Sequence, residues 1–142
     1  MRDEAGGRRS TLSIGWRLQD MIEQKRRDMK LRTKRLALPV IHSYPALPKS
    51  TIAQVLGKQV LPSATSVGAH YREACRAKSS ADFVSKLEGG LQELDETGYW
   101  LELLQDAEIA NADRIKPLAV ETNELLSIFV SVVKSVKFPA RA

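Results

Sequence analysis

Apolar residues recur at helical spacing in four segments, and no long alternation of apolar and polar residues typical of a β-strand occurs. The segments span residues 16–44, 50–76, 79–108 and 111–138. Short polar or proline-containing stretches separate them. Four amphipathic helices with short connections predict an all-α fold, an antiparallel up-down-up-down four-helix bundle.

The apolar positions define one expected core-facing stripe on each helix, with neighbours mostly three, four or seven residues apart. Within these stripes we expect inward side chains at Ile22, Met29, Leu36, Val40 and Ile41, at Ile52, Val55, Val60 and Val67, at Phe83, Leu87, Leu94 and Leu101, and at Ile115, Leu125, Phe129 and Val133. The second segment is also rich in Gly, Ala and Ser, which predicts close approach of a neighbouring helix.

Capping residues predict where the helices begin. Ser50 and Ser79 suit N-cap positions, and Asn111 begins the last segment. Pro39 and Pro62 fall inside the first two segments, where each removes one backbone hydrogen bond and predicts a kink.

Positive charge is concentrated at the start of the chain. The net charge is +5, and residues 1–35 hold 11 Lys and Arg against five acids, so 11 − 5 = +6 lies there and 5 − 6 = −1 on the remainder. We expect residues 1–15 to form a basic N-terminal tail and residues 16–142 to form the bundle. A basic segment on a neutral body attracts phosphate groups or an acidic protein.

The run from residue 25 to residue 35 is the best candidate for a binding feature. Two interpretations are open: a solvent-exposed helix face that binds nothing, or a face that contacts RNA or DNA. The run contains no aromatic residue, so stacking on single-stranded bases is not favoured. The candidate nucleic-acid-binding residues are Lys25, Arg26, Arg27, Lys30, Arg32, Lys34 and Arg35.

On the third and fourth predicted helices, the apolar surface is wider than a single core-facing stripe requires. An oversized core and a surface for self-association both explain this pattern, and we favour self-association. The candidate oligomer-interface residues are Tyr99, Trp100, Leu103, Ile128 and Val130.

Charged residues around the second connection predict an ion-pair cluster. Arg72 and Arg76 lie one helical turn apart, with Asp82 and Glu88 early in the next helix. The alternative is a phosphate or RNA contact that includes Lys78.

Acidic residues line the outward face of the third predicted helix, and we expect them to form salt bridges within one subunit or between subunits, with Lys58 as one partner. This face consists of Glu88, Gln92, Asp95, Tyr99, Glu102 and Asp106. Bundle metal sites use inward-facing Glu residues together with Glu-x-x-His, a pattern that is absent here. We therefore expect no metal.

The sequence offers no catalytic constellation. Cys75 and His70 are five positions apart, on different sides of a helix, without an Asp or Asn placed to orient them. The chain also lacks phosphate-loop, CxxC, HExxH and GxSxG motifs. We therefore expect a protein that is not an enzyme and has no cofactor.

Composition favours a cytoplasmic bacterial protein. A single cysteine forms no intramolecular disulfide. The polar N-terminus is not followed by the apolar run of a signal peptide, and the longest apolar run is too short to cross a membrane.

From Leu31 to about Lys137 the chain resembles the four-helix bundle family encoded in intervening sequences of bacterial 23S ribosomal RNA genes. The resemblance rests on the words LRTKRLAL, LPKSTIAQVLGKQVL, SATSVGAHYREACRAKSSADFVSKL, DETGYWLELL and ELLSIFVSVVKS. The order and spacing of these sequence segments also match those of the family. Pro39 and Pro62 depart from the family pattern, which commonly has a basic or other helix-compatible residue there.

The resemblance implies a compact antiparallel bundle that assembles as a homopentamer with a central channel. It brings no catalytic residues. A similar fold serves as the accessory protein of diversity-generating retroelements, where a basic pentamer engages a reverse transcriptase and nucleic acid. The resemblance therefore implies RNA, DNA or a reverse transcriptase as partner.

Overall fold

The structure, a computed structural model, describes the backbone of residues 4–140 and the side chains of residues 15–140. It contains four α-helices and one short 3-10 helix, and no strand occurs among the described residues, so the predicted all-α fold is confirmed. The elements are α1 (Glu4–Ser43), η1 (Tyr44–Ala46), α2 (Thr51–Cys75), α3 (Ser80–Asp106) and α4 (Ala112–Lys137).

Side-chain caps fix the starts of the last three helices, as predicted for Ser50 and Ser79. Ser50 Oγ accepts from the Ala53 N–H at 3.2 Å, and Ser79 Oγ accepts from the Asp82 N–H at 3.0 Å. At α4, Asn111 Oδ1 accepts from the Asp113 N–H at 2.9 Å. Each bond satisfies a backbone donor that has no partner within its helix.

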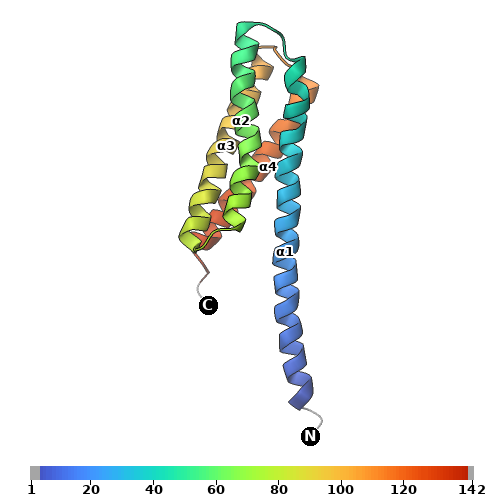
Figure 1. The fold of residues 1–142 in the computed structure, drawn as a ribbon, viewed down its shortest axis with the longest axis vertical. Coiled ribbons are helices and arrows are strands. Elements are labelled where there is room, and N and C mark those ends of the chain that lie inside the picture. Colours follow the sequence, from blue (N-terminus) through green and yellow to red (C-terminus); the bar gives the residue numbers. More distant parts are fainter. Residues whose placement is uncertain (1–3, 141–142) are drawn as a thin grey trace.

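The four helices pack in chain order. The α2–α3 interface is the most extensive, followed by α3–α4 and α1–α2, whereas α1 and α4 barely touch. Figure 1 shows α1 leaning away from the other three helices toward its N-terminus. Residues of both the first and the third connection line one cavity, so these two connections lie at the same end of the bundle. Because α1 packs on α2 and α2 packs on α3, α1 and α3 occupy opposite corners of the bundle.

The core consists of two apolar clusters. The first contains Leu36, Val67, Ala74, Val84, Leu87, Leu94, Leu125, Phe129 and Val133. The second, nearer the first connection, contains Val40, Val60, Ala64, Leu101, Leu104 and Ile115. Small residues permit the close packing. A Cβ atom on Gly90 would lie 2.8 Å from Phe129 Cε2, so the absence of a side chain there lets this ring fill the first cluster.

α1 is longer than the helices it packs against. It has 40 residues against 25 in α2, so its N-terminal part extends past the end of the bundle (Figure 1). Ile22, expected in the core, is 47% exposed because no helix lies beside it there. The helix also begins at Glu4, before the predicted start at Trp16, so the segment expected to be a separate tail is helical from residue 4.

Other expectations for the first two helices are corrected as well. Ile41, Ile52 and Val55 were expected inside but are exposed. At Pro39 and Pro62, by contrast, the helices continue, which agrees with a kink in place of a helix end, and the kinks themselves stay a prediction. Each proline is exposed. On the solvent side of a helix, the carbonyl that loses its partner can bind water.

Candidate nucleic-acid interface

The basic run of the sequence lies on the part of α1 where the helix meets the bundle. Met29, Thr33 and Leu36 face the bundle. The charged side chains occupy the rest of the helix surface. Lys25, Arg27, Lys34 and Arg35 are exposed, whereas Arg26, Lys30 and Arg32 are half-buried.

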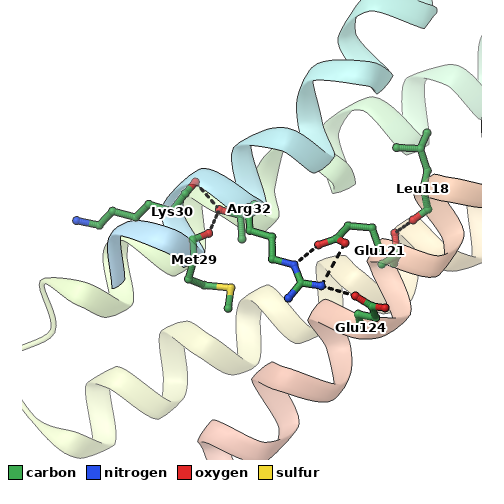
Figure 2. A network of polar contacts seen from close by, with 8 residues as sticks. Met29, Lys30, Arg32, Leu118, Glu121 and Glu124 are labelled. Carbon is green, nitrogen blue, oxygen red and sulfur yellow. Dashed lines mark hydrogen bonds and ion pairs between the residues drawn. The ribbon is translucent and has the colours of Figure 1, made fainter. Parts of the chain in front are cut away.

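Arg32 holds α1 to α4. Its Nε donates a hydrogen bond to Glu121 Oε1, and its Nη2 donates to Glu121 Oε2 at 3.2 Å (Figure 2). Nη2 also donates to Glu124 Oε2. The hydrogen bond to Glu121 is the main reason that the pKa of Arg32 is raised, against the opposing effect of burial. Arg32 was predicted as a nucleic-acid contact, but in this structure it is a link between helices.

Arg26 lies on the side of α1 that approaches α2. Burial is the main reason that the pKa of Tyr71 is raised, the neighbouring Cys75 adds to the rise, and the positive charge of Arg26 opposes it. The Tyr71 ring packs against Phe129 with ring centroids 5.8 Å apart, and Cys75 is half-buried beside it. These contacts make Cys75 part of a packed corner of the bundle.

Charge is segregated between opposite corners. α1 carries ten Lys and Arg against four acids, or 10 − 4 = +6, whereas α3 carries one Lys against seven acids, or 1 − 7 = −6. The acids Asp95, Glu102 and Asp106 are exposed, as expected for the outward face of this helix. The molecule therefore presents a basic edge and an acidic edge on opposite sides.

The predicted ion-pair cluster at the second connection does not form. Among residues 15–140, Arg72, Arg76 and Asp82 form no ion pair within 4.0 Å, and Glu88 instead accepts from Lys137 Nζ at 2.6 Å. Glu88 reaches α4 because the end of α4 packs beside the start of α3. Lys58, the predicted partner of the acidic face, also forms no ion pair there.

The predicted oligomer-interface residues differ in exposure. Tyr99 is 54% exposed. Leu103, Ile128 and Val130 are half-buried. Trp100 packs against the second core cluster, and its Nε1 is buried without a hydrogen-bond partner among the described residues. Trp100 is therefore mainly a core residue.

Glu93 lies in surroundings that favour its protonated form. Burial between α2 and α3 raises the pKa of Glu93, and the charge of Glu96 adds to that rise, whereas His70 opposes it. His70 Nδ1 lies 3.7 Å from Glu73 Oε2, too far for a hydrogen bond. No group of three metal-binding side chains occurs among the described residues.

A cavity at the end of the bundle was not predicted from the sequence. It measures about 340 Å³ and lies between the first and third connections, where Tyr44, Leu47, Ile109 and Arg114 contribute to its lining. Among the described residues, no carboxylate, histidine or cysteine lines it. The cavity arises from the meeting of two loops distant in sequence, which no local pattern indicates.

The comparisons with known proteins decide the family. The model of the 23S rRNA-intervening sequence protein family matches residues 25–131. The chain belongs to this family. The matched region begins at Lys25, the first residue of the basic run, so the overhanging part of α1 precedes it.

A solved structure has the same architecture. It is a protein of unknown function from the S23 ribosomal protein family of Bacteroides thetaiotaomicron, 34% identical to this chain with a TM-score of 0.71. The alignment covers 78% of this chain and 98% of the other. No match was found among curated proteins. No helix in the described part of the chain is long and apolar enough to cross a membrane.

Proposed function

We propose that this family member is a non-enzymatic, self-assembling helical bundle that binds RNA or DNA through the basic face of α1. The observation that carries this proposal is the exposure of Lys25, Arg27, Lys34 and Arg35 on a helix of net charge +6. These cations lie at a corner of the bundle, where a long polyanion can run along the helix.

The chemistry of the face favours a structured nucleic acid. Arg27 and Lys34 are seven residues apart, so they stand about 10 Å from each other along one side of α1. Arginine binds phosphate through two hydrogen bonds, and each contact releases counterions from the nucleic acid. The basic run has no aromatic side chain for base stacking, so we expect contacts with the backbone and little sequence preference.

A titration at several salt concentrations tests the binding. The labelled ligands are an RNA hairpin and a DNA duplex, with fluorescence anisotropy as the readout. We expect the logarithm of the affinity to fall linearly with the logarithm of the salt concentration, by about 0.9 per duplex DNA phosphate contacted. Binding that is absent at low salt, or independent of salt, would overturn the proposal.

Self-assembly is the second part of the proposal, and we expect a pentamer. Its support is the exposed Tyr99 together with the half-buried Leu103 one turn further along α3. Light scattering after gel filtration should give a mass near five times 15.8 kDa at micromolar protein. A mass that stays at 15.8 kDa would contradict it.

An adaptor role is the second candidate function. The exposed Leu31 and Leu38 lie between the α1 cations, and apolar contacts of this kind favour a protein surface over a phosphate backbone. The partner would be an acidic protein, such as the reverse transcriptase of a diversity-generating retroelement. A complex with such a purified enzyme that survives nuclease treatment would favour this role, and one that nuclease dissolves would favour nucleic acid.

A further inference from the structure

The outer face of α1 has an apolar centre and a basic rim. We define the α1 outer face by five residues: Arg27, Leu31, Lys34, Arg35 and Leu38. Leu31 is 45% exposed and Leu38 is 36% exposed. All five lie within an arc of roughly 100° at 100° per residue, on the side opposite the buried Leu36.

The outer face of α3 has the complementary composition. We define the α3 outer face by another five residues: Asp95, Tyr99, Glu102, Leu103 and Asp106. Tyr99 is 54% exposed at its centre, and the three acids are exposed around it. Among the described residues, neither Asp95 nor Glu102 forms an ion pair.

These two faces cannot meet within one molecule. α1 packs on α2, α2 packs on α3, and α1 and α3 stand at opposite corners with their outer faces directed away from the core. Lys34 and Arg35 likewise form no ion pair among residues 15–140. Each face therefore has its charge and its apolar centre available for another molecule.

We propose that copies of this chain join head to tail, with the α1 outer face of one copy docked on the α3 outer face of the next. The inference rests on the self-assembly part of the proposed function and assigns its two surfaces. A contact between two α1 faces would bring basic residues together, and a contact between two α3 faces would bring acids together. Opposite charge favours the heterologous pairing, which closes into a ring when the rotation between copies permits.

The spacing of the two faces supports this pairing. Leu31 and Leu38 are seven residues apart, as are Asp95 and Glu102, so each pair spans about 10 Å of helix. With the helices side by side, the Tyr99 ring of one copy fits between the two leucines of the other. Lys34 and Arg35 then lie level with the Tyr99 ring, and Asp95 and Glu102 lie about 5 Å to either side along the helix axis, within reach of these long basic side chains. The ring supplies the buried apolar contact, and the charges supply orientation.

Because the α1 outer face is also the proposed nucleic-acid surface, assembly and nucleic acid compete for it. Nucleic acid does not suit the α3 outer face, where carboxylates repel phosphate. We therefore expect added RNA to dissociate the assembly.

Charge reversal tests the pairing by sedimentation velocity at micromolar protein. The α1 variant is Lys34→Glu/Arg35→Glu, and the α3 variant is Asp95→Lys/Glu102→Lys. We expect each variant alone to sediment as a monomer and the chain carrying all four substitutions to regain assembly. All sites are exposed, and circular dichroism checks that each variant is folded.

The outcomes separate this inference from the proposed function. If the wild-type protein is monomeric, both the assembly proposal and the pairing are overturned. If it assembles but neither double variant weakens the assembly at least tenfold, or if the fourfold variant stays monomeric while folded, only the pairing is overturned. RNA titration is a second test. The α3 variant should bind RNA at least as tightly as the wild type, because its α1 outer face is not occupied by another copy, and the α1 variant should bind at least tenfold more weakly.

Discussion

Arg32 on α1 donates through Nη2 to Glu121 Oε2 on α4 at 3.2 Å, across the edge of the bundle where these two helices barely touch. The residues are 89 positions apart in the chain. With Glu124 on the same helix, they form a polar link at an interface that has little apolar packing (Figure 2). This link adds a polar attachment of α1 to α4 beside the apolar packing of α1 on α2.

Replacing Arg32 should loosen α1. We expect Arg32→Gln to lower the free energy of unfolding by about 0.5–1 kcal/mol, because the ion pair is partly exposed and two carboxylates are left side by side. Urea denaturation measures the loss. The matched control is Arg35→Gln, since Arg35 is exposed and has no ion-pair partner among the described residues, and it should change stability by much less. Equal losses for the two variants would contradict the role assigned to Arg32.

Two glycines of α3 should respond oppositely to alanine. A Cβ on Gly90 would meet Phe129 at 2.8 Å, and because this ring is 1% exposed it cannot move aside, so Gly90→Ala should destabilise by about 1–3 kcal/mol. A Cβ on Gly98 would lie 3.8 Å from Thr122, an ordinary contact, so Gly98→Ala should gain up to about 1 kcal/mol of helix propensity. The urea midpoints of the two variants test this, and a midpoint for Gly90→Ala at or above the wild type would refute the packing argument.

Glu93 should make stability depend on pH. Its folded-state pKa is raised above the ordinary value of 4.5, so the folded protein favours the protonated form, and stability falls as the pH rises from 4.5 through the folded pKa. Glu93→Gln removes this penalty and should stabilise the protein at pH 7 by about 0.5 kcal/mol. The gain should shrink as the pH falls through 4.5 and vanish well below it, where Glu93 is protonated in both states.

Urea denaturation from pH 4 to pH 8 measures the difference in unfolding free energy between Glu93→Gln and the wild type. Glu23→Gln, at an exposed site, serves as the matched control for the loss of one carboxylate. A loss of stability for Glu93→Gln at pH 7, or a gain that persists unchanged at pH 4, would contradict the assignment.

The overhanging part of α1 should be dispensable for the stability of the bundle. Trp16, Leu18 and Ile22 are exposed, and the α1 contacts with the apolar core begin at Met29. Removing residues 1–24 should therefore change the free energy of unfolding by no more than about 0.5 kcal/mol. Hydrogen exchange in the full chain offers a second check, since amides of residues 15–24 should exchange far faster than those of residues 29–40. A large loss of stability on truncation would show that this segment packs on the bundle.

The sequence predicted features that depend on neighbouring residues. The caps at Ser50 and Ser79 each use a donor three residues away, and helical spacing located most of the core. The start of the overhang could not be predicted in this way. Ile22 has the same seven-residue relation to Met29 that Met29 has to Leu36, and only the shorter length of α2 leaves Ile22 exposed.

The charged contacts were harder to predict, because they join residues far apart in the chain. The run of cations located the candidate interface but did not show that Arg32 alone among its candidates meets Glu121 and Glu124. Glu88 was expected to pair across the adjacent connection, yet it pairs with Lys137, 49 positions away. Charge counts predict which surface is basic, whereas individual partners depend on how the helices pack.

The position of the cations is the central claim, and a comparison of two charge-matched variants tests it most directly. Lys34→Gln/Arg35→Gln removes two charges from α1, and Lys116→Gln/Lys134→Gln removes two exposed charges from α4. Anisotropy titration of an RNA hairpin at one low salt concentration measures both. We predict a loss of affinity of at least tenfold for the α1 variant and less than threefold for the α4 variant. Equal losses would mean that only net charge attracts RNA and would contradict the assignment of α1 as the binding face.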